Sequence, residues 1–157
     1  AARHVDRRLH PDRSRAGDFA VSSRANPKSR TIFCCGCKTD VTARLTTGKE
    51  IYPHRRDLAS LPFWKCDACG NFVGCHHKTS DRTRPLGCIP TPEIKTARSH
   101  IHRILDPLWK ENRVPRRDLY QRIAASIGVA EYHTAEIRSV EQAREVYRVV
   151  TEIEASL

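Results

Sequence analysis

Two short motifs, Cys34-Cys35-Gly36-Cys37 and Cys66-Asp67-Ala68-Cys69, decide how this chain folds. Each C-x-x-C motif forms a tight turn that presents two thiolates, and two such turns can complete a tetrahedron around one zinc ion. The 28 residues between the motifs provide enough chain for a hairpin and a loop. Four thiolates leave no coordination position for water, so the pattern predicts one structural Zn²⁺. Its predicted ligands are Cys34, Cys37, Cys66 and Cys69.

The residues next to the two motifs suit the turn to different degrees. Gly70 follows the second motif, and glycine readily adopts the left-handed backbone that turns neighbouring N–H groups toward the sulfurs. The first motif has Lys38 in that position and therefore fits less well. An odd total of 7 cysteines argues against a disulfide framework and favours a reducing compartment. We expect the remaining Cys35, Cys75 and Cys88 to be buried thiols.

Short strands are expected on both sides of the second motif. Residues 41–45 alternate apolar and polar side chains, the period of a half-buried strand. Residues 46–49 form a predicted turn, and residues 50–52 can return as a second strand. A polar loop follows over residues 53–62, and two further strands are predicted at residues 63–65 and 72–74.

The last third of the chain has the period of helices. Thr91 and Pro92 form a typical helix start, and the proline at position 107 should kink or end that first helix. A second helix is expected from about Pro115 to a stop at Gly128, and a third begins at Ser139. The sequence therefore predicts an α+β fold in which a small β-hairpin, zinc-ribbon-like module leads into a three-helix unit.

The positive charge is concentrated in the first two thirds of the chain. The whole sequence has 28 Lys and Arg against 18 Asp and Glu, but residues 93–157 are nearly balanced, with 11 basic and 10 acidic side chains. Residues 1–31 are basic, contain few apolar side chains and show no periodicity, so we expect a flexible arm. The predicted organisation is an arm at 1–31, a zinc-binding β module at 32–92 and a helical unit at 93–157.

Clustered arginines favour contact with phosphate groups. Aromatic side chains between them, such as Tyr52, Phe63, Trp64 and Phe72, either stack bases or form the small core. We predict that nucleic acid contacts basic side chains of the arm and of the zinc module. These are Arg3, Arg7, Arg8, Arg13, Arg15, Arg24, Lys28, Arg30, Arg55, Arg56, Lys78, Arg82 and Arg84.

The order of three motifs resembles a family of small zinc-finger-containing proteins from phages and prophages. The motifs are the segment from Trp64 to His76, with Cys66, Cys69 and a Val-Gly-Cys-His end, then Pro85-Leu86-Gly87, then Asp106-Pro107-Leu108-Trp109. The resemblance implies a zinc-binding fold carried in mobile elements, with the same four cysteines as ligands, and it implies no particular activity. The chain departs from the family in having Cys35-Gly36 inside the first motif.

Three functions are compatible with these observations. The leading hypothesis is a non-catalytic, nucleic-acid-associated zinc protein of a phage or mobile element, acting in the cytoplasm of a bacterial host. The second is an adaptor that binds a protein of a host or phage transcription or replication complex. The third is a metal-dependent nuclease, suggested by His76-His77 and Asp81, but no complete second metal site or phosphate-binding loop is evident.

The sequence also argues against a membrane protein. No apolar run approaches the roughly 18 residues that a membrane-spanning helix needs. The basic N-terminal residues are not followed by the apolar segment of a secretory signal, so we expect no membrane partner. The sequence makes no prediction of the oligomeric state.

Overall fold

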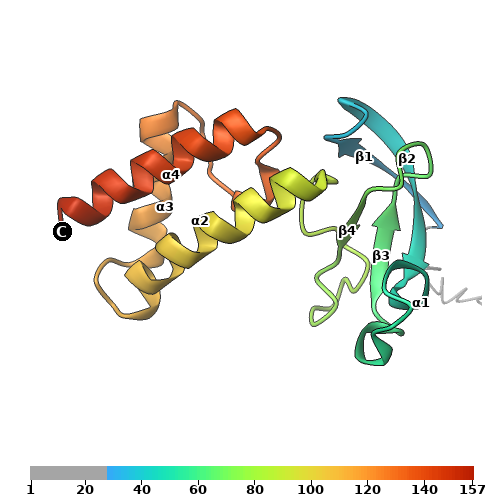
Figure 1. Ribbon diagram of the computed structural model, residues 1–157. Helices are drawn as coiled ribbons and strands as arrows, with labels where there is room; N and C mark the ends of the chain where they lie inside the picture. Colours follow the sequence, from blue (N-terminus) through green and yellow to red (C-terminus); the bar gives the residue numbers. More distant parts are fainter. Residues whose placement is uncertain (1–27) are drawn as a thin grey trace, which may run out of the picture.

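The computed structural model describes residues 28–157, which form an antiparallel sheet followed by a group of helices (Figure 1). Four strands lie in the order in which they occur along the chain: β1 (Ser29–Cys34), β2 (Thr39–Thr47), β3 (Pro62–Lys65) and β4 (Phe72–Gly74). Three long helices follow, α2 (Pro92–Lys110), α3 (Arg116–Ile127) and α4 (Val140–Ala155). The predicted α+β class is confirmed.

The hairpin of the zinc module is formed by different segments from those expected. Strand β1 begins at Ser29 and pairs with β2 from Ser29↔Arg44 to Cys34↔Thr39, so residues 29–31, which were predicted to belong to the arm, are part of the sheet. The six predicted contact residues between Arg3 and Arg24 lie outside the described residues.

The predicted return strand at residues 50–52 is wrong, because Gly48–Ile51 is the short helix α1. Gly48 allows this close packing, since a Cβ at that position would overlap the carbonyl oxygen of Leu58. The following loop includes the 3₁₀ turn Arg56–Leu58, and Gly48 N–H donates to the carbonyl oxygen of Leu61 at 2.9 Å. This bond joins the two ends of the segment between β2 and β3, so that β3 pairs with β2.

Trp64 is the centre of the small sheet core. Its side chain is fully buried beside Ile32, Ala43 and Val73, and its indole Nε1 donates to the carbonyl oxygen of Thr83 at 2.6 Å. Burying the indole N–H with a partner removes the desolvation cost of an unpaired donor. Trp64 is therefore a core residue and not a base-stacking platform.

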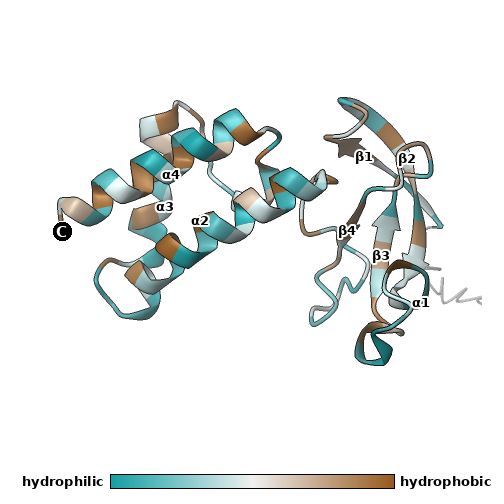
Figure 2. Ribbon diagram, in the orientation of Figure 1, coloured by the Kyte–Doolittle hydropathy of each residue, from teal (hydrophilic) through white to brown (hydrophobic). Residues whose placement is uncertain are grey.

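The starts of α2 and α4 and the stop of α3 lie where the sequence indicated. Thr91 Oγ1 accepts from Ile94 N–H at 3.2 Å, Ser139 Oγ accepts from Gln142 N–H at 3.1 Å, and Gly128 ends α3 with a φ of 75°. Hydrophobic residues recur along each helix in the ribbon coloured by hydropathy (Figure 2), and the three helices enclose a core that includes Leu105, Leu119 and Val146.

Pro107 does not end α2, which continues to Lys110. A proline within a helix removes one backbone hydrogen bond. Here Leu105 and Leu108, on either side of it, are fully buried in the helical core. Their burial favours continuation of the helix, because each buried leucine contributes about 1.5–3 kcal/mol.

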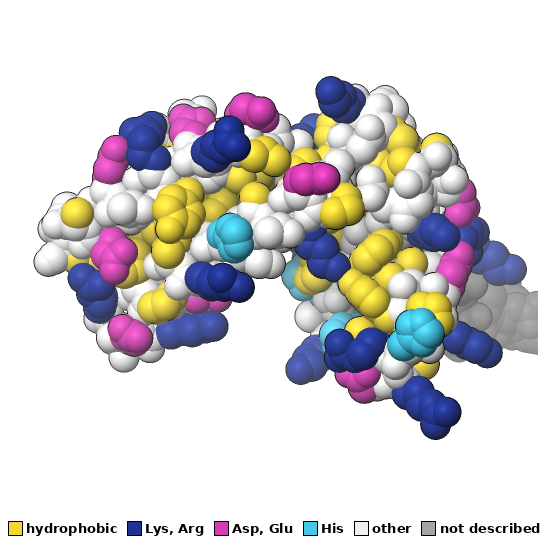
Figure 3. Space-filling model, viewed as in Figure 1, with side chains coloured by type: hydrophobic (Ala, Val, Ile, Leu, Met, Phe, Trp, Pro, Cys, Tyr) yellow, Lys and Arg dark blue, Asp and Glu magenta, His cyan; other side chains and the backbone are white. Residues whose placement is uncertain are grey.

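The sheet and the helices meet at a narrow junction, and the surface is indented between them in the space-filling view (Figure 3). A third small core of Cys35, Cys88 and Ile94, packed by Phe33 and Val140, lies there. Gly87 is part of the same junction, because a Cβ at this position would overlap the backbone oxygen of Ala135. The Pro-Leu-Gly turn thus brings the zinc module into contact with the chain ahead of α4.

We predict that Gly87→Ala destabilises the protein by about 1–3 kcal/mol, the usual cost of forcing an extra methyl group into a packed site. Denaturant unfolding followed by circular dichroism measures this effect. Gly74→Ala is the matched control, since its Cβ would meet only the side chains of Leu86 and Phe63. Equal stability of the two variants would show that the approach of Gly87 to Ala135 does not limit the packing of the junction.

Candidate metal centre and basic cleft

Four cysteine sulfurs converge at one end of the sheet. Cys34 ends β1 and Cys37 lies in the turn to β2, while Cys66 and Cys69 lie between β3 and β4. The Sγ–Sγ distances are 3.4 Å between Cys34 and Cys69 and 3.7 Å between Cys37 and Cys66. All four sulfurs lie within 4.8 Å of one another. The structure therefore brings together all four predicted ligands.

The donor set fits one structural zinc ion. A Zn–S bond of about 2.3 Å places the sulfurs of a tetrahedral site about 3.8 Å apart, close to the spacing seen here. The hydrogen bond with Cys66, together with burial, raises the pKa of the Cys37 thiol to about 12. A divalent ion that accepts four thiolates removes the repulsion between them. When bound, it would crosslink the two turns, and no ligand position would remain for water.

Backbone conformation explains how both turns reach this geometry. Gly70 has a φ of 80°, as the second motif predicts, and Lys38 adopts the same left-handed region with a φ of 57°. For a residue other than glycine this costs roughly 1–2 kcal/mol. Gly36 is needed for a steric reason, since a Cβ at this position would lie 3.3 Å from Cys69 Sγ and 2.5 Å from the Asn71 side-chain amide. The unusual Cys35-Gly36 pair thus permits the two turns to approach each other.

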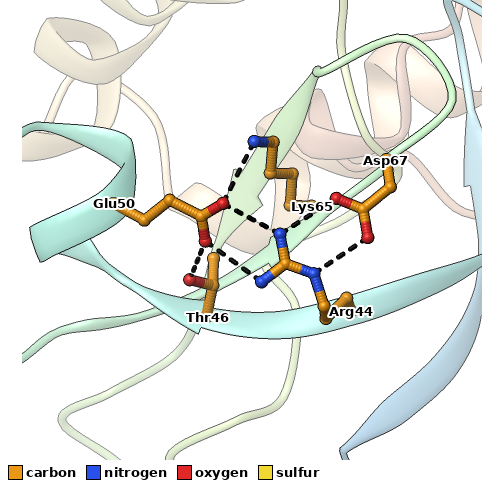
Figure 4. Close-up of polar contacts among 5 residues, drawn as sticks. All are labelled: Arg44, Thr46, Glu50, Lys65 and Asp67. Atoms are coloured by element: carbon orange, nitrogen blue, oxygen red, sulfur yellow. Dashed lines mark hydrogen bonds and ion pairs between the residues drawn. The ribbon is translucent and has the colours of Figure 1, made fainter.

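A network of charged side chains holds the second turn against the sheet (Figure 4). Arg44 on β2 donates to both carboxylate oxygens of Asp67, at 2.8 and 2.9 Å, and also to both oxygens of Glu50. Lys65 Nζ and the Thr46 hydroxyl donate to Glu50 as well. The Arg44 guanidinium holds the pKa of both carboxyl groups below the usual range. Because Asp67 lies between Cys66 and Cys69, this network positions the second cysteine turn.

The three cysteines outside the ligand set, Cys35, Cys75 and Cys88, are buried, as the sequence predicts. Burial raises the pKa of the Cys75 thiol to about 11. Within residues 28–157, the four-cysteine set is the one group of three or more metal-binding side chains close enough to share an ion, so His76, His77 and Asp81 do not assemble a second centre there.

A cleft of about 760 Å³ lies between the sheet and the helical unit. Four arginines line it, Arg30 and Arg84 from the zinc module and Arg116 and Arg138 from the helical unit. The first two were predicted from the sequence, and the last two were missed because they lie in a segment that is balanced in charge. Three histidines also line the cleft, as do the carboxylates of Asp40 and Glu136.

Aromatic rings orient two of these arginines. The guanidinium carbon of Arg138 lies 4.0 Å from the ring centre of Phe33, and that of Arg116 lies 5.0 Å from the ring centres of both Trp109 and Tyr120. Stacking of this kind holds the planar cation while leaving its N–H groups available to another acceptor.

The other predicted contact residues within the described part of the chain do not line this cleft. Arg55 is paired with Asp57 at 2.7 Å on the exposed loop, and Arg56 lies in the adjacent 3₁₀ turn. Lys78 and Arg82 are exposed on the segment after β4, and Lys28 precedes β1.

This sheet with its converging cysteines, followed by a helical unit, defines a zinc-finger-type α+β domain. The model of the family DUF3268, described as a zinc-finger-containing domain, matches residues 30–153, and the chain belongs to this family. Searches of curated proteins and of solved structures gave no match. Across residues 28–157, no helix combines the length and the apolar character needed to cross a membrane.

We predict that the purified protein contains about one zinc ion per chain and that Cys66→Ser removes it, because three thiolates and a weak hydroxyl ligand hold zinc less tightly. Metal analysis by mass spectrometry measures the stoichiometry. Cys75→Ser is the matched control, since Cys75 is buried in the same sheet core but outside the ligand set.

Removal of zinc by a chelator should abolish amide-exchange protection in β1–β4, while α2–α4, which have their own core, should retain their protection. Full protection of the sheet after verified zinc removal would contradict a structural role.

A separate prediction concerns the Arg44 network. Arg44→Leu should lower zinc affinity by roughly tenfold, the lower end of the effect of losing groups that support metal ligands. Competition with a chromogenic chelator measures the change. Arg55→Leu serves as the control, because it removes a similar exposed ion pair, with Asp57, that involves neither cysteine turn. If both variants retain zinc equally, Asp67 does not need Arg44 to hold the turn.

Proposed function

We propose that the protein binds nucleic acid through the basic cleft between the zinc module and the helical unit, in a non-catalytic role. The observation that carries the proposal is the convergence on one cleft of four arginines from separate segments of the chain, the most distant being Arg30 and Arg138. None of Arg30, Arg84, Arg116 and Arg138 forms an ion pair with a carboxylate within residues 28–157. Arginines without carboxylate partners favour a ligand that supplies anionic oxygens.

The composition of the cleft favours a phosphate backbone with neighbouring bases. Arginine binds phosphate through two parallel N–H donors, and Tyr120 adds an aromatic side chain to the same lining. Asp40 and Glu136 reduce the net positive charge of the lining. We therefore expect moderate affinity with a clear salt dependence, and little sequence preference, because the arginines that line the cleft suit contacts with phosphate rather than readout of base edges.

The basic N-terminal segment joins the chain beside this cleft. One residue, Lys28, separates residues 1–27 from β1, and the second residue of β1, Arg30, lines the cleft. The predicted contacts of the arm, including Arg13, Arg15 and Arg24, would therefore extend the same binding surface. The resemblance to phage and prophage proteins supports a role in a mobile element, in the cytoplasm of its bacterial host.

Fluorescence anisotropy with labelled single-stranded and duplex oligonucleotides tests the proposal. The double variant Arg84→Ala/Arg138→Ala should weaken binding to all sequences equally and reduce the slope of log K against log salt by about 2. The control is Arg122→Ala/Arg148→Ala, which removes two exposed arginines outside the cleft. Unchanged zinc content in both variants shows that the fold is retained.

Two results would overturn the proposal. One is no binding to any oligonucleotide at low salt, which would leave the protein-adaptor hypothesis. The other is an equal loss in the cleft variant and in the control, which would indicate binding by general charge alone.

A further inference from the structure

Two cysteines that are not zinc ligands form a separate pair at the junction of the two units. The sulfurs of Cys35 and Cys88 lie 3.7 Å apart, and both side chains are buried. The backbone fixes their positions, because Cys35 N–H donates to the Ile89 carbonyl oxygen and Ile89 N–H donates to that of Phe33, each at 2.8 Å. The two segments thus hold the thiols side by side.

A buried arginine contacts this pair. Arg98 on α2 is 9% exposed, and its Nη2 lies 3.0 Å from Cys88 Sγ and 2.7 Å from the Ile137 carbonyl oxygen. Its Nη1 donates to the Cys88 carbonyl oxygen at 3.3 Å, and its Nε has no partner. Within residues 28–157 no carboxylate pairs with it, although a buried guanidinium ordinarily has an anionic partner. The sulfur of Cys88 is the neighbouring atom that can take up negative charge.

Both thiols are almost fully buried, since Cys35 is 5% and Cys88 is 3% exposed. Cys88 is also one of the residues that line the cleft. The contact with Arg98 at 3.0 Å therefore selects Cys88 as the sulfur that is oxidised first.

We propose that Cys35 and Cys88 form a peroxide-sensitive dithiol that closes to a disulfide. In the first step the Cys88 sulfur attacks one oxygen of hydrogen peroxide, and the O–O bond breaks. Cys88 becomes a sulfenic acid, and the departing hydroxide leaves as water with the thiol proton. In the second step the Cys35 sulfur displaces the hydroxyl group from Cys88, an S–S bond forms, and a second water leaves with the proton of Cys35. Two thiols and one peroxide thus give one disulfide and two waters.

Arg98 assists the first step because its charged N–H group, which lies beside the Cys88 sulfur, stabilises the negative charge that passes to the departing oxygen as the O–O bond breaks. The second step needs only a small movement, since the sulfurs close from 3.7 Å to about 2.05 Å. The product would join the first zinc turn covalently to the segment that leads into α2, across the junction beneath the cleft.

Treatment of the zinc-loaded full chain with hydrogen peroxide tests the proposal. Peptide mass spectrometry with differential thiol alkylation should find a Cys35–Cys88 crosslink whose mass is lower by two hydrogen atoms, while the zinc content stays unchanged. In Cys35→Ser, the sulfenic acid at Cys88 should persist and be trapped by dimedone. In Cys88→Ser, no sulfenic acid should form at Cys35. Cys75→Ser is the control and should retain the crosslink.

The role of Arg98 is tested by rate. Arg98→Met should slow oxidation of Cys88 by at least about tenfold, and Arg98→Lys, which keeps the charge, should recover most of the rate. The wild-type experiment alone decides the pairing if the Met variant does not fold. A crosslink that involves a zinc ligand, release of zinc before any Cys35–Cys88 product forms, or equal rates in the wild type and the Met variant would overturn the proposal.

Discussion

Four sulfurs within 4.8 Å of one another are the constraint on which this structure depends. Thiolates at that spacing repel one another unless they share a cation, and the arrangement suits one structural zinc ion. The sheet is short, and its core rests on Trp64, a few aliphatic side chains and the cysteines themselves. A core of this size contributes little stability on its own, which makes the metal part of the fold.

The small size of the sheet core also affects the junction between the zinc module and the helical unit. Because the sheet and the helices have separate cores, they touch through a few side chains around Cys35, Cys88 and Ile94 and through the close approach of Gly87. A narrow contact leaves an open cleft beside it, and arginines from both units line that cleft. Residues of the zinc module line one wall of the cleft, and residues of the helical unit line the other. The proposed nucleic-acid surface and the proposed dithiol therefore both depend on how the two units meet.

Local signals in the sequence were reliable where the controlling interaction is local. The caps at Thr91 and Ser139 and the stop at Gly128 involve atoms within one turn of the helix, so residue identity alone specifies them. The strand predicted at residues 50–52 was wrong because contacts with Leu58 and Leu61 decide the path of that segment. Of the two outcomes expected at Pro107, a kink or an end of the helix, the end does not occur, since buried leucines on both sides favour continuation of α2.

The sequence by itself determined the four predicted zinc ligands, the α+β order, the starts of α2 and α4 and the stop of α3. Ligand spacing, periodicity and caps are written in residues close to one another along the chain. Only the tertiary structure decided that Arg116 and Arg138 join Arg30 and Arg84, and that Cys35 meets Cys88 and Arg98. These groups come from segments tens of residues apart, and their meeting depends on how two separately packed cores are oriented, which no local pattern encodes.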